Sequence, residues 1–198
     1  AELYPEKPIY DIPALPVCTG QELTDRLMEQ IAPFRPVFHY GQMAEALEKL
    51  ADGSWLLTTS EGTRLNAPVI VIAAGGGSFV PKRPPLADLD IFEATGGVQY
   101  AVRKRDTFAG KKLVIAGGGD SALDWTVNLV DIAGSVTLVH RRDDFRAAPD
   151  TVSKMRALVA EGRVNLHIGQ LKGLEGSDGT LSHVLVQSPG AEAPTALD

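Results

Sequence analysis

The stretch KKLVIAGGGDSALDW, residues 111–125, decides how this chain folds. Residues 113–116 form a short apolar run with lysines before it and glycines after it, a pattern typical of a strand buried on both faces of a parallel sheet. Residues 122–130 then place apolar side chains at helical spacing. The stretch therefore predicts a strand, a glycine turn and a helix in direct succession.

The turn has the spacing of a nucleotide-binding motif. Gly117, Gly119 and Ala122 match G-x-G-x-x-A, in which the first position allows a tight turn, the second close approach of a pyrophosphate, and the third close helix packing. Together with Gly118, they lead into Asp120 and Ser121, where free N–H groups and the positive end of the helix dipole face an anion. A tight turn in any α/β domain could show the same residues, so the motif alone leaves both interpretations open.

A basic cluster follows at a fitting distance. His140 comes 23 positions after Gly117 (140 minus 117), close to the roughly 20 at which these folds place the residue that meets the adenosine ribose. Enzymes that bind NAD need an acid there, but here His140 is followed by Arg141, Arg142 and then Arg146. Guanidinium groups grip a 2′-phosphate and offer a bare ribose no acceptor. The cluster predicts NADP rather than NAD, the alternative being a solvated basic loop.

Composition narrows the class of protein. With 198 residues, 44% of them hydrophobic, the chain has material for one ordinary domain or two small ones. A net charge of −6 argues against a nucleic-acid footprint. Cys18 is the only cysteine, which excludes an internal disulfide and a cysteine zinc cluster and fits a reducing cytoplasm. The sequence shows neither an apolar stretch long enough for a membrane span nor a signal peptide, and it lacks an initiator methionine, so we expect a piece of a longer cytoplasmic protein.

The first half of the chain has mixed patterns. Prolines make 4–16 an extended loop, and a capping box at 19–22 opens a helix with a buried stripe at Leu23, Leu27 and Ile31. We expect strands at 37–40 and 69–73 and a hairpin of 55–60 with 63–66. Residues 43–50 fit a helix or a bulged strand equally well. Residues 79–97 show no sustained periodicity and suggest a crossing between domains.

The second half is more regular. We expect a helix at 152–160, a strand at 163–168, a hairpin within 170–188, and no core pattern in the last ten residues. Four stretches taken together, 4–11, 73–81, 117–125 and 140–147, resemble the two-dinucleotide flavoprotein reductases, and within them the thioredoxin-reductase-like ferredoxin–NADP reductases. The resemblance spans nearly the whole chain.

This resemblance implies an α/β fold, with part of an FAD-binding domain at 1–93 and a Rossmann-like NADP-binding domain at 94–198. The NADP-binding domain would hold a parallel sheet flanked by helices, plus a β-hairpin or meander. It implies that Tyr4, Ala44, Gly75 and Phe79 lie in the FAD-binding part, with Tyr4 stacked on the isoalloxazine ring and Ala44 near the adenine. Without the resemblance, these residues read as ordinary loop, backbone and core positions.

The resemblance also implies an oxidoreductase that passes electrons between NADPH and ferredoxin or flavodoxin through FAD, as a homodimer when complete. The cofactors would do the chemistry, so no catalytic side chain is expected. We interpret His39, His167 and His183 as partners in local hydrogen bonds, and Asp143, Asp144 and Asp150 as charges that balance the arginines.

Two departures limit the resemblance. Residues 100–105 stand where a thioredoxin reductase has its C-x-x-C pair, which excludes thioredoxin as the acceptor. The family's N-terminal glycine fingerprint and C-terminal Gly-Asp motif for FAD are absent from the sequence, so we expect it to hold NADP better than FAD. A nucleotide-binding module without turnover is the alternative function.

Overall fold

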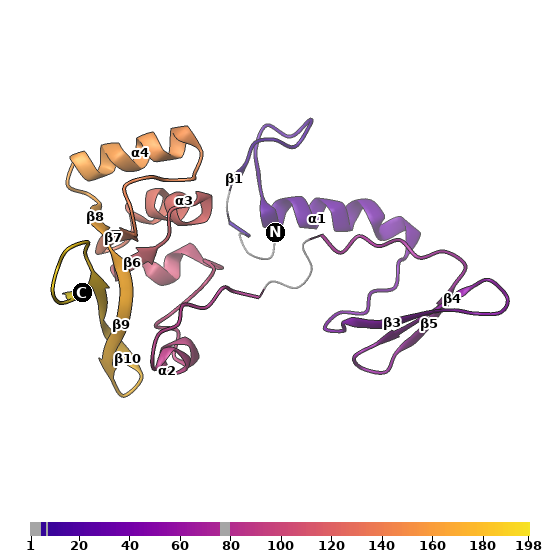
Figure 1. Ribbon diagram of the computed structural model, residues 1–198. Coiled ribbons are helices and arrows are strands. Elements are labelled where there is room, and N and C mark those ends of the chain that lie inside the picture. The colour runs from indigo at the N-terminus through magenta and orange to yellow at the C-terminus, as the bar shows by residue number, and fades with distance from the viewer. Residues whose placement is uncertain (1–4, 7, 76–79) are drawn as a thin grey trace. The chain divides into compact units, whose positions relative to one another are not determined.

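The computed structural model describes residues 5–6, 8–75 and 80–198 (Figure 1). Its elements are, in chain order, β1 Pro8–Ile9, β2 Cys18–Thr19, α1 Gly20–Ile31, η1 Ala32–Phe34, β3 Ala44–Lys49, β4 Trp55–Thr59, β5 Arg64–Ala67, α2 Leu89–Ala94, η2 Arg105–Phe108, β6 Lys112–Ala116, α3 Asp120–Leu129, β7 Ser135–His140, α4 Pro149–Ala160, β8 Asn165–Ile168, β9 Gln170–Ser177, β10 Thr180–Gln187 and β11 Thr195–Leu197. The described residues fall into two compact units. Unit 1 comprises residues 83–198 with the described residues before 25, and unit 2 comprises 25–82.

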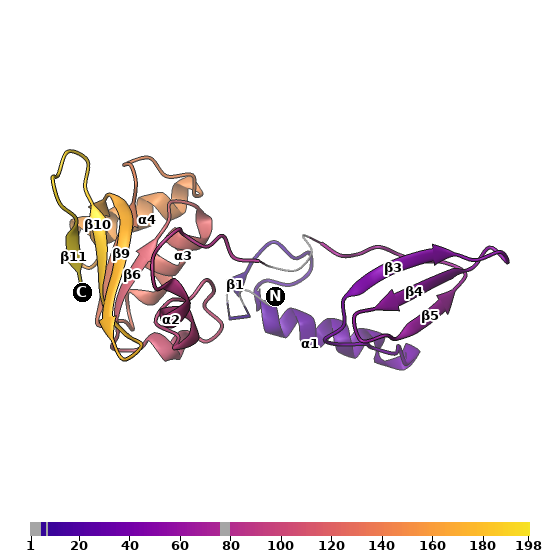
Figure 2. The same cartoon turned by 60° about the horizontal axis from the view of Figure 1, so that its bottom comes forward.

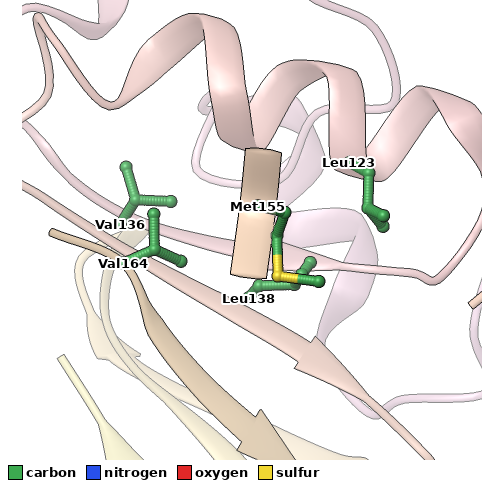
Figure 3. Close-up of a cluster of buried hydrophobic side chains, with 5 residues drawn as sticks. All are labelled: Leu123, Val136, Leu138, Met155 and Val164. Carbon is green, nitrogen blue, oxygen red and sulfur yellow. The ribbon is translucent and has the colours of Figure 1, made fainter. Parts of the chain in front are cut away.

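A parallel sheet of order β6-β7-β8 forms the centre of unit 1. Side chains alternate along β7, because successive residues of a strand point to opposite faces. Val136 and Leu138 pack with Leu123 of α3 and Met155 of α4, so both helices cover one face of the sheet (Figure 3). This is the apolar face that the helical spacing of 122–130 predicts.

An antiparallel meander covers the opposite face of the parallel sheet. Strands β9, β10 and β11 form a sheet of order β11-β10-β9 (Figure 2). Val184 and Val186 of β10 pack against Val139 of β7. Unit 1 thus has a helix layer, a parallel sheet and an antiparallel sheet. The predicted α/β fold with a meander is confirmed.

Helix α1 begins as the sequence predicts but presents a different face. The capping box is present, since the Thr19 N–H donates to Glu22 Oε2 at 2.8 Å and the Glu22 N–H donates to Thr19 Oγ1 at 3.1 Å. The predicted buried stripe is wrong, because Leu27 is 50% exposed and Gly20 is the only buried residue of this helix.

Unit 2 contains one antiparallel sheet of order β3-β4-β5. The hairpin of β4 and β5 is as predicted, and the open question at 43–50 resolves as a strand with an irregularity between Ala44 and Ala46. The strands expected at 37–40 and 69–73 are wrong. In the described residues neither segment has a partner strand, and a β-strand needs one to satisfy its backbone polar groups.

Two elements in unit 1 lie where the sequence showed no pattern. Helix α2 buries Leu89 and Phe92, although it is only six residues long, too short for periodicity to show. Strand β11 pairs with β10 in the final residues.

The two compact units have other boundaries than the predicted division into residues 1–93 and 94–198. That division describes the cofactor-binding domains of a whole protein, and it stays a prediction.

Candidate functional site

The glycine turn and the basic cluster start side by side at one edge of the parallel sheet. Ala116 ends β6 and is the register partner of Val139, next to the last residue of β7. The Gly117 N–H donates to the Val139 carbonyl at 3.0 Å, which extends this pairing by one residue. Residues 117–122 and 140–146, which are far apart in the sequence, therefore meet at the carboxyl ends of two neighbouring strands, where open α/β sheets bind their ligands.

The three glycines of the turn serve different purposes. A Cβ at Gly117, whose φ is +154°, would lie 2.8 Å from Cβ of Ala122, so the close packing of strand and helix requires both small residues. A Cβ at Gly118 would lie 2.5 Å from Cε1 of His140. A Cβ at Gly119 would meet nothing within 4 Å, and its φ of −104° suits any residue. The protein's own packing does not demand glycine at 119, and the space in front of it is open.

Helix α3 begins at this open space. Gly119 is its N-cap and provides no side-chain cap. The carboxylate of Asp120, at the first helical position, forms a hydrogen bond outside the helix: its Oδ1 accepts the N–H of Ala148 at 2.8 Å. The positive end of the helix dipole thus lies at Gly119, where it would favour an anion, and Ser121 is exposed in the same turn.

Backbone hydrogen bonds attach the basic loop, defined as residues 141–148, to the glycine turn. The Arg146 N–H donates to the Gly118 carbonyl at 2.7 Å, and the bond from Ala148 to Asp120 lies two residues further on. At the start of the loop, the His140 carbonyl accepts the Gly169 N–H at 2.9 Å. The loop is held at both ends, so its arginines are carried on backbone whose position relative to Gly118 is fixed.

The arginines of the loop differ from others in unit 1. Arg141, Arg142 and Arg146 are exposed, and within the described ranges their guanidinium groups form no ion pair. By contrast, Arg83, Arg156 and Arg163 pair with carboxylates. Charge that is left unpaired beside a helix N-terminus is available to an anionic ligand.

His140 is placed differently from the arginines. Its ring lies against Gly118 and beside Phe145, with ring centroids 5.3 Å apart and planes tilted by 33°. The cation of Arg156, on helix α4, lies 5.1 Å from the centroid of Phe145. Sequence reasoning missed Phe145 and Arg156, because Phe145 reads as one apolar residue in a charged loop and Arg156 lies on a helix outside the motif.

Asp143, Asp150 and His167 each have a local partner. Asp143 pairs with Arg156, and Asp150 pairs with Lys154 at 2.7 Å, a contact that raises the pKa of Lys154. His167 Nε2 lies 3.0 Å from Ser188 Oγ. Among the residues that the structure describes, no group of three histidine, cysteine, aspartate or glutamate side chains could hold a metal ion. The contact of His167 agrees with local hydrogen bonding. Of the three aspartates expected to balance arginines, only Asp143 pairs with one among the described residues, because Asp150 pairs with a lysine and Asp144 forms no ion pair there.

Of the four residues expected near FAD, the structure describes Ala44 and Gly75. Tyr4 and Phe79 lie outside the described residues. Ala44 is the exposed first residue of β3, and Gly75 lies in a turn with φ of +56°; both belong to unit 2. Among the residues described after Gly75, the first helix is α2, which begins only at Leu89, after Pro84 and Pro85. Their role toward FAD stays a prediction.

Curated relatives are similar over nearly the whole chain. It is 57% identical over 199 residues to a protein of Parvibaculum lavamentivorans and 60% identical over 182 residues to one of a Bradyrhizobium species, both named ferredoxin–NADP reductase. These alignments cover 100% and 92% of this chain but 58% and 53% of the relatives. The chain thus spans about half the length of the curated relatives it matches.

Solved structures agree on the fold. The thioredoxin reductase of Lactococcus lactis matches 96% of this chain and 60% of its own length with a TM-score of 0.78 at 21% identity. The thioredoxin reductase of T. acidophilum matches 99% of this chain and 61% of its own with a TM-score of 0.79 at 14% identity. No helix of the described residues has the length and apolar character that crossing a membrane requires. Residues 7–180 match the pyridine nucleotide-disulphide oxidoreductase family, and the chain belongs to that family.

Proposed function

We propose that this chain binds NADP(H) at the carboxyl edge of its parallel sheet, as part of an FAD-dependent oxidoreductase that exchanges electrons between NADPH and ferredoxin or flavodoxin. One observation carries the proposal. The open space before Gly119 lies at the same sheet edge as Arg141, Arg142 and Arg146, which form no ion pair with the residues that the structure describes. Two hydrogen bonds join the basic loop to the glycine turn and the start of α3.

Each part of this site fits a different part of NADP. The N–H groups at the start of α3 suit the pyrophosphate, because Gly119 leaves room for close backbone approach. Arg141, Arg142 and Arg146 suit the 2′-phosphate, because a guanidinium forms paired hydrogen bonds with phosphate oxygens. His140 supports the turn by packing on Gly118 and would add a donor beside the ribose.

The chemistry belongs to the cofactors. FAD would accept a hydride from NADPH and release electrons singly to the acceptor, and the residues of this chain bind, orient and exclude water. Tyr4, Ala44, Gly75 and Phe79 are proposed to lie on the FAD side. Cys18, the single cysteine of these 198 residues, is buried, so this chain's own residues could not form a dithiol relay to thioredoxin.

One wider feature of the proposal, the redox partner, is supported by the relatives. Proteins named ferredoxin–NADP reductase at 57% and 60% identity support ferredoxin as the partner. We further propose a homodimer in the cytoplasm, with residues 1–93 contributing to the FAD domain and 94–198 forming the NADP domain. The second candidate is a nucleotide-binding module without turnover. It is favoured because, among the residues described after Gly75, the first helix is α2, which begins only at Leu89.

The test is to compare this chain with the same chain extended to the full length of its relatives. The extended protein should carry stoichiometric flavin absorbance and oxidise NADPH when ferredoxin is supplied. The 198-residue chain should bind NADPH with little or no flavin. If the extended protein binds NADPH but remains colourless after FAD is added, the reductase proposal is wrong and the nucleotide-binding module is favoured.

A further inference from the structure

The basic loop contains acids among its arginines, and these acids create a problem for a phosphate site. Arg141, Arg142 and Arg146 are accompanied by Asp143 and Asp144, which leaves the loop a net charge of +1. A carboxylate next to Arg142 in sequence can reach the same guanidinium groups as a ligand phosphate. Something must keep it from doing so.

Arg156 of α4 holds one of these acids. Its Nη2 bonds Oδ1 of Asp143, while its guanidinium carbon lies 5.1 Å from the ring centroid of Phe145. Phe145 in turn lies against His140, whose ring packs on Gly118. A series of contacts therefore runs from helix α4 through the basic loop to the glycine turn.

The ion pair of Arg156 and Asp143 contributes little to the stability of the fold. The Arg156 and Asp143 side chains are 41% and 59% exposed, and exposed ion pairs contribute about 0.2 to 1 kcal/mol to folding. The effect on a ligand is electrostatic, because Arg156 raises the summed formal charge from +1 for the loop alone to +2, and its guanidinium bonds the Asp143 carboxylate. Asp144 forms no ion pair within the described ranges and does not reach the three loop arginines.

We propose that Arg156 is a positioning residue for recognition of the 2′-phosphate: it sequesters Asp143 and thereby keeps Arg141, Arg142 and Arg146 free for the ligand. The inference rests on the proposed NADP(H) binding. It adds a specificity determinant that touches Asp143 and Phe145 rather than the nucleotide.

The test titrates adenosine 2′,5′-bisphosphate into the 198-residue chain, a probe that carries the 2′-phosphate and needs no flavin. Arg156→Ala should weaken binding about three- to tenfold. Binding of adenosine 5′-monophosphate, which lacks the 2′-phosphate, should change by less than about twofold, because screening limits charge effects beyond the Debye length. Adding Asp143→Asn to Arg156→Ala should restore most of the lost affinity, since the neutral amide cannot neutralise the arginines.

Arg163→Ala is the matched control. Arg163 forms an ion pair with Asp131 at similar exposure, and neither residue belongs to the loop or the glycine turn. Its removal should leave affinity for the bisphosphate unchanged. An Arg156→Ala variant that binds the bisphosphate like the unmutated chain would overturn the inference, as would a loss that Asp143→Asn fails to restore. If the unmutated chain does not bind the bisphosphate at all, the proposed function fails, and the inference fails with it.

Discussion

The parallel sheet of unit 1 and the antiparallel sheet of unit 2 differ in what covers them. Strand β7 is packed between helices on one face and the β10 strand on the other. In unit 2, Thr59 is the only buried residue among those described, and Val71 and Ile72 are more than 80% exposed. Apolar sequence therefore becomes a stable core in one unit and a solvent-facing surface in the other.

The difference teaches what a periodic pattern can predict. An apolar run indicates that a segment will be buried, but its conformation depends on whether a partner is present to bury it. Around β7 the helices α3 and α4 that bury one face directly precede and follow the strand in sequence. For residues 69–73, the described part of the chain supplies no neighbouring strand.

The largest expected effect contrasts equivalent leucines of the two units. Leu138→Ala in β7, where the side chain is fully buried, should lower the free energy of unfolding of unit 1 by about 2 to 5 kcal/mol. Leu47→Ala in β3, where the side chain is 43% exposed, should cost unit 2 less than about 1 kcal/mol.

Each unit contains one tryptophan, so the two costs can be measured separately. Trp125 lies in α3 and Trp55 in β4. Urea unfolding followed by fluorescence in a Trp55→Phe background reports on unit 1, and in a Trp125→Phe background on unit 2. Equal losses in the two units would contradict the contrast in burial.

The next effect concerns ligand affinity at the sheet edge of unit 1. Arg141→Ala with Arg142→Ala should remove roughly 2 to 4 kcal/mol of NADPH binding, taking about 1.5 to 3 for each hydrogen bond to a charged group and allowing for compensation. Isothermal titration calorimetry measures the affinity for NADPH. Lys154→Ala, which removes an exposed ion pair with Asp150 on α4, is the control. Full affinity in the double variant would show that the loop does not hold the 2′-phosphate.

A smaller loss of NADPH affinity is expected from alanine substitutions at Gly119 and Gly118, which should differ in their effect on stability. Gly119→Ala should lower stability by no more than about 1 kcal/mol, the cost of alanine at an N-cap, yet weaken NADPH binding about tenfold by filling the open space. Gly118→Ala should reduce both, because its Cβ would strike the His140 ring. Thermal unfolding and titration of the two variants decide the point; unchanged affinity in Gly119→Ala would place the pyrophosphate elsewhere.

The smallest effect is expected at the thiol. Cys18→Ala should leave NADPH affinity within about twofold, since a 1.4 kcal/mol change would be needed for tenfold and Cys18 lies in β2, outside the glycine turn and the loop. A titration that shows a tenfold loss, with circular dichroism unchanged, would refute this.

The sequence predicted the nucleotide region well because its information is local. Glycine spacing, the helical face of 122–130 and the basic residues after β7 all lie within one strand-helix-strand unit, and the structure forms each of these elements. The capping box at Thr19 is equally local and is also present.

Other features depend on contacts that no short window contains. The exposure of Leu27, the lack of a strand at residues 69–73 and the pairing of β11 with β10 each depend on a distant partner or, within the described residues, on its absence. The contact of Arg156 with Asp143 and Phe145 likewise joins a helix to a loop. From the charge pattern alone, Arg156 looks like any other charged residue on the solvated surface of a helix.

The central claim is that the edge of the parallel sheet recognises NADP through its 2′-phosphate. The most direct measurement is a titration of the unmutated 198-residue chain with NADP⁺ and with NAD⁺ under the same low-salt conditions. NADP⁺ should bind at least about 30-fold more tightly, the factor that corresponds to roughly 2 kcal/mol from the arginine contacts. Equal affinity for the two nucleotides would contradict the account.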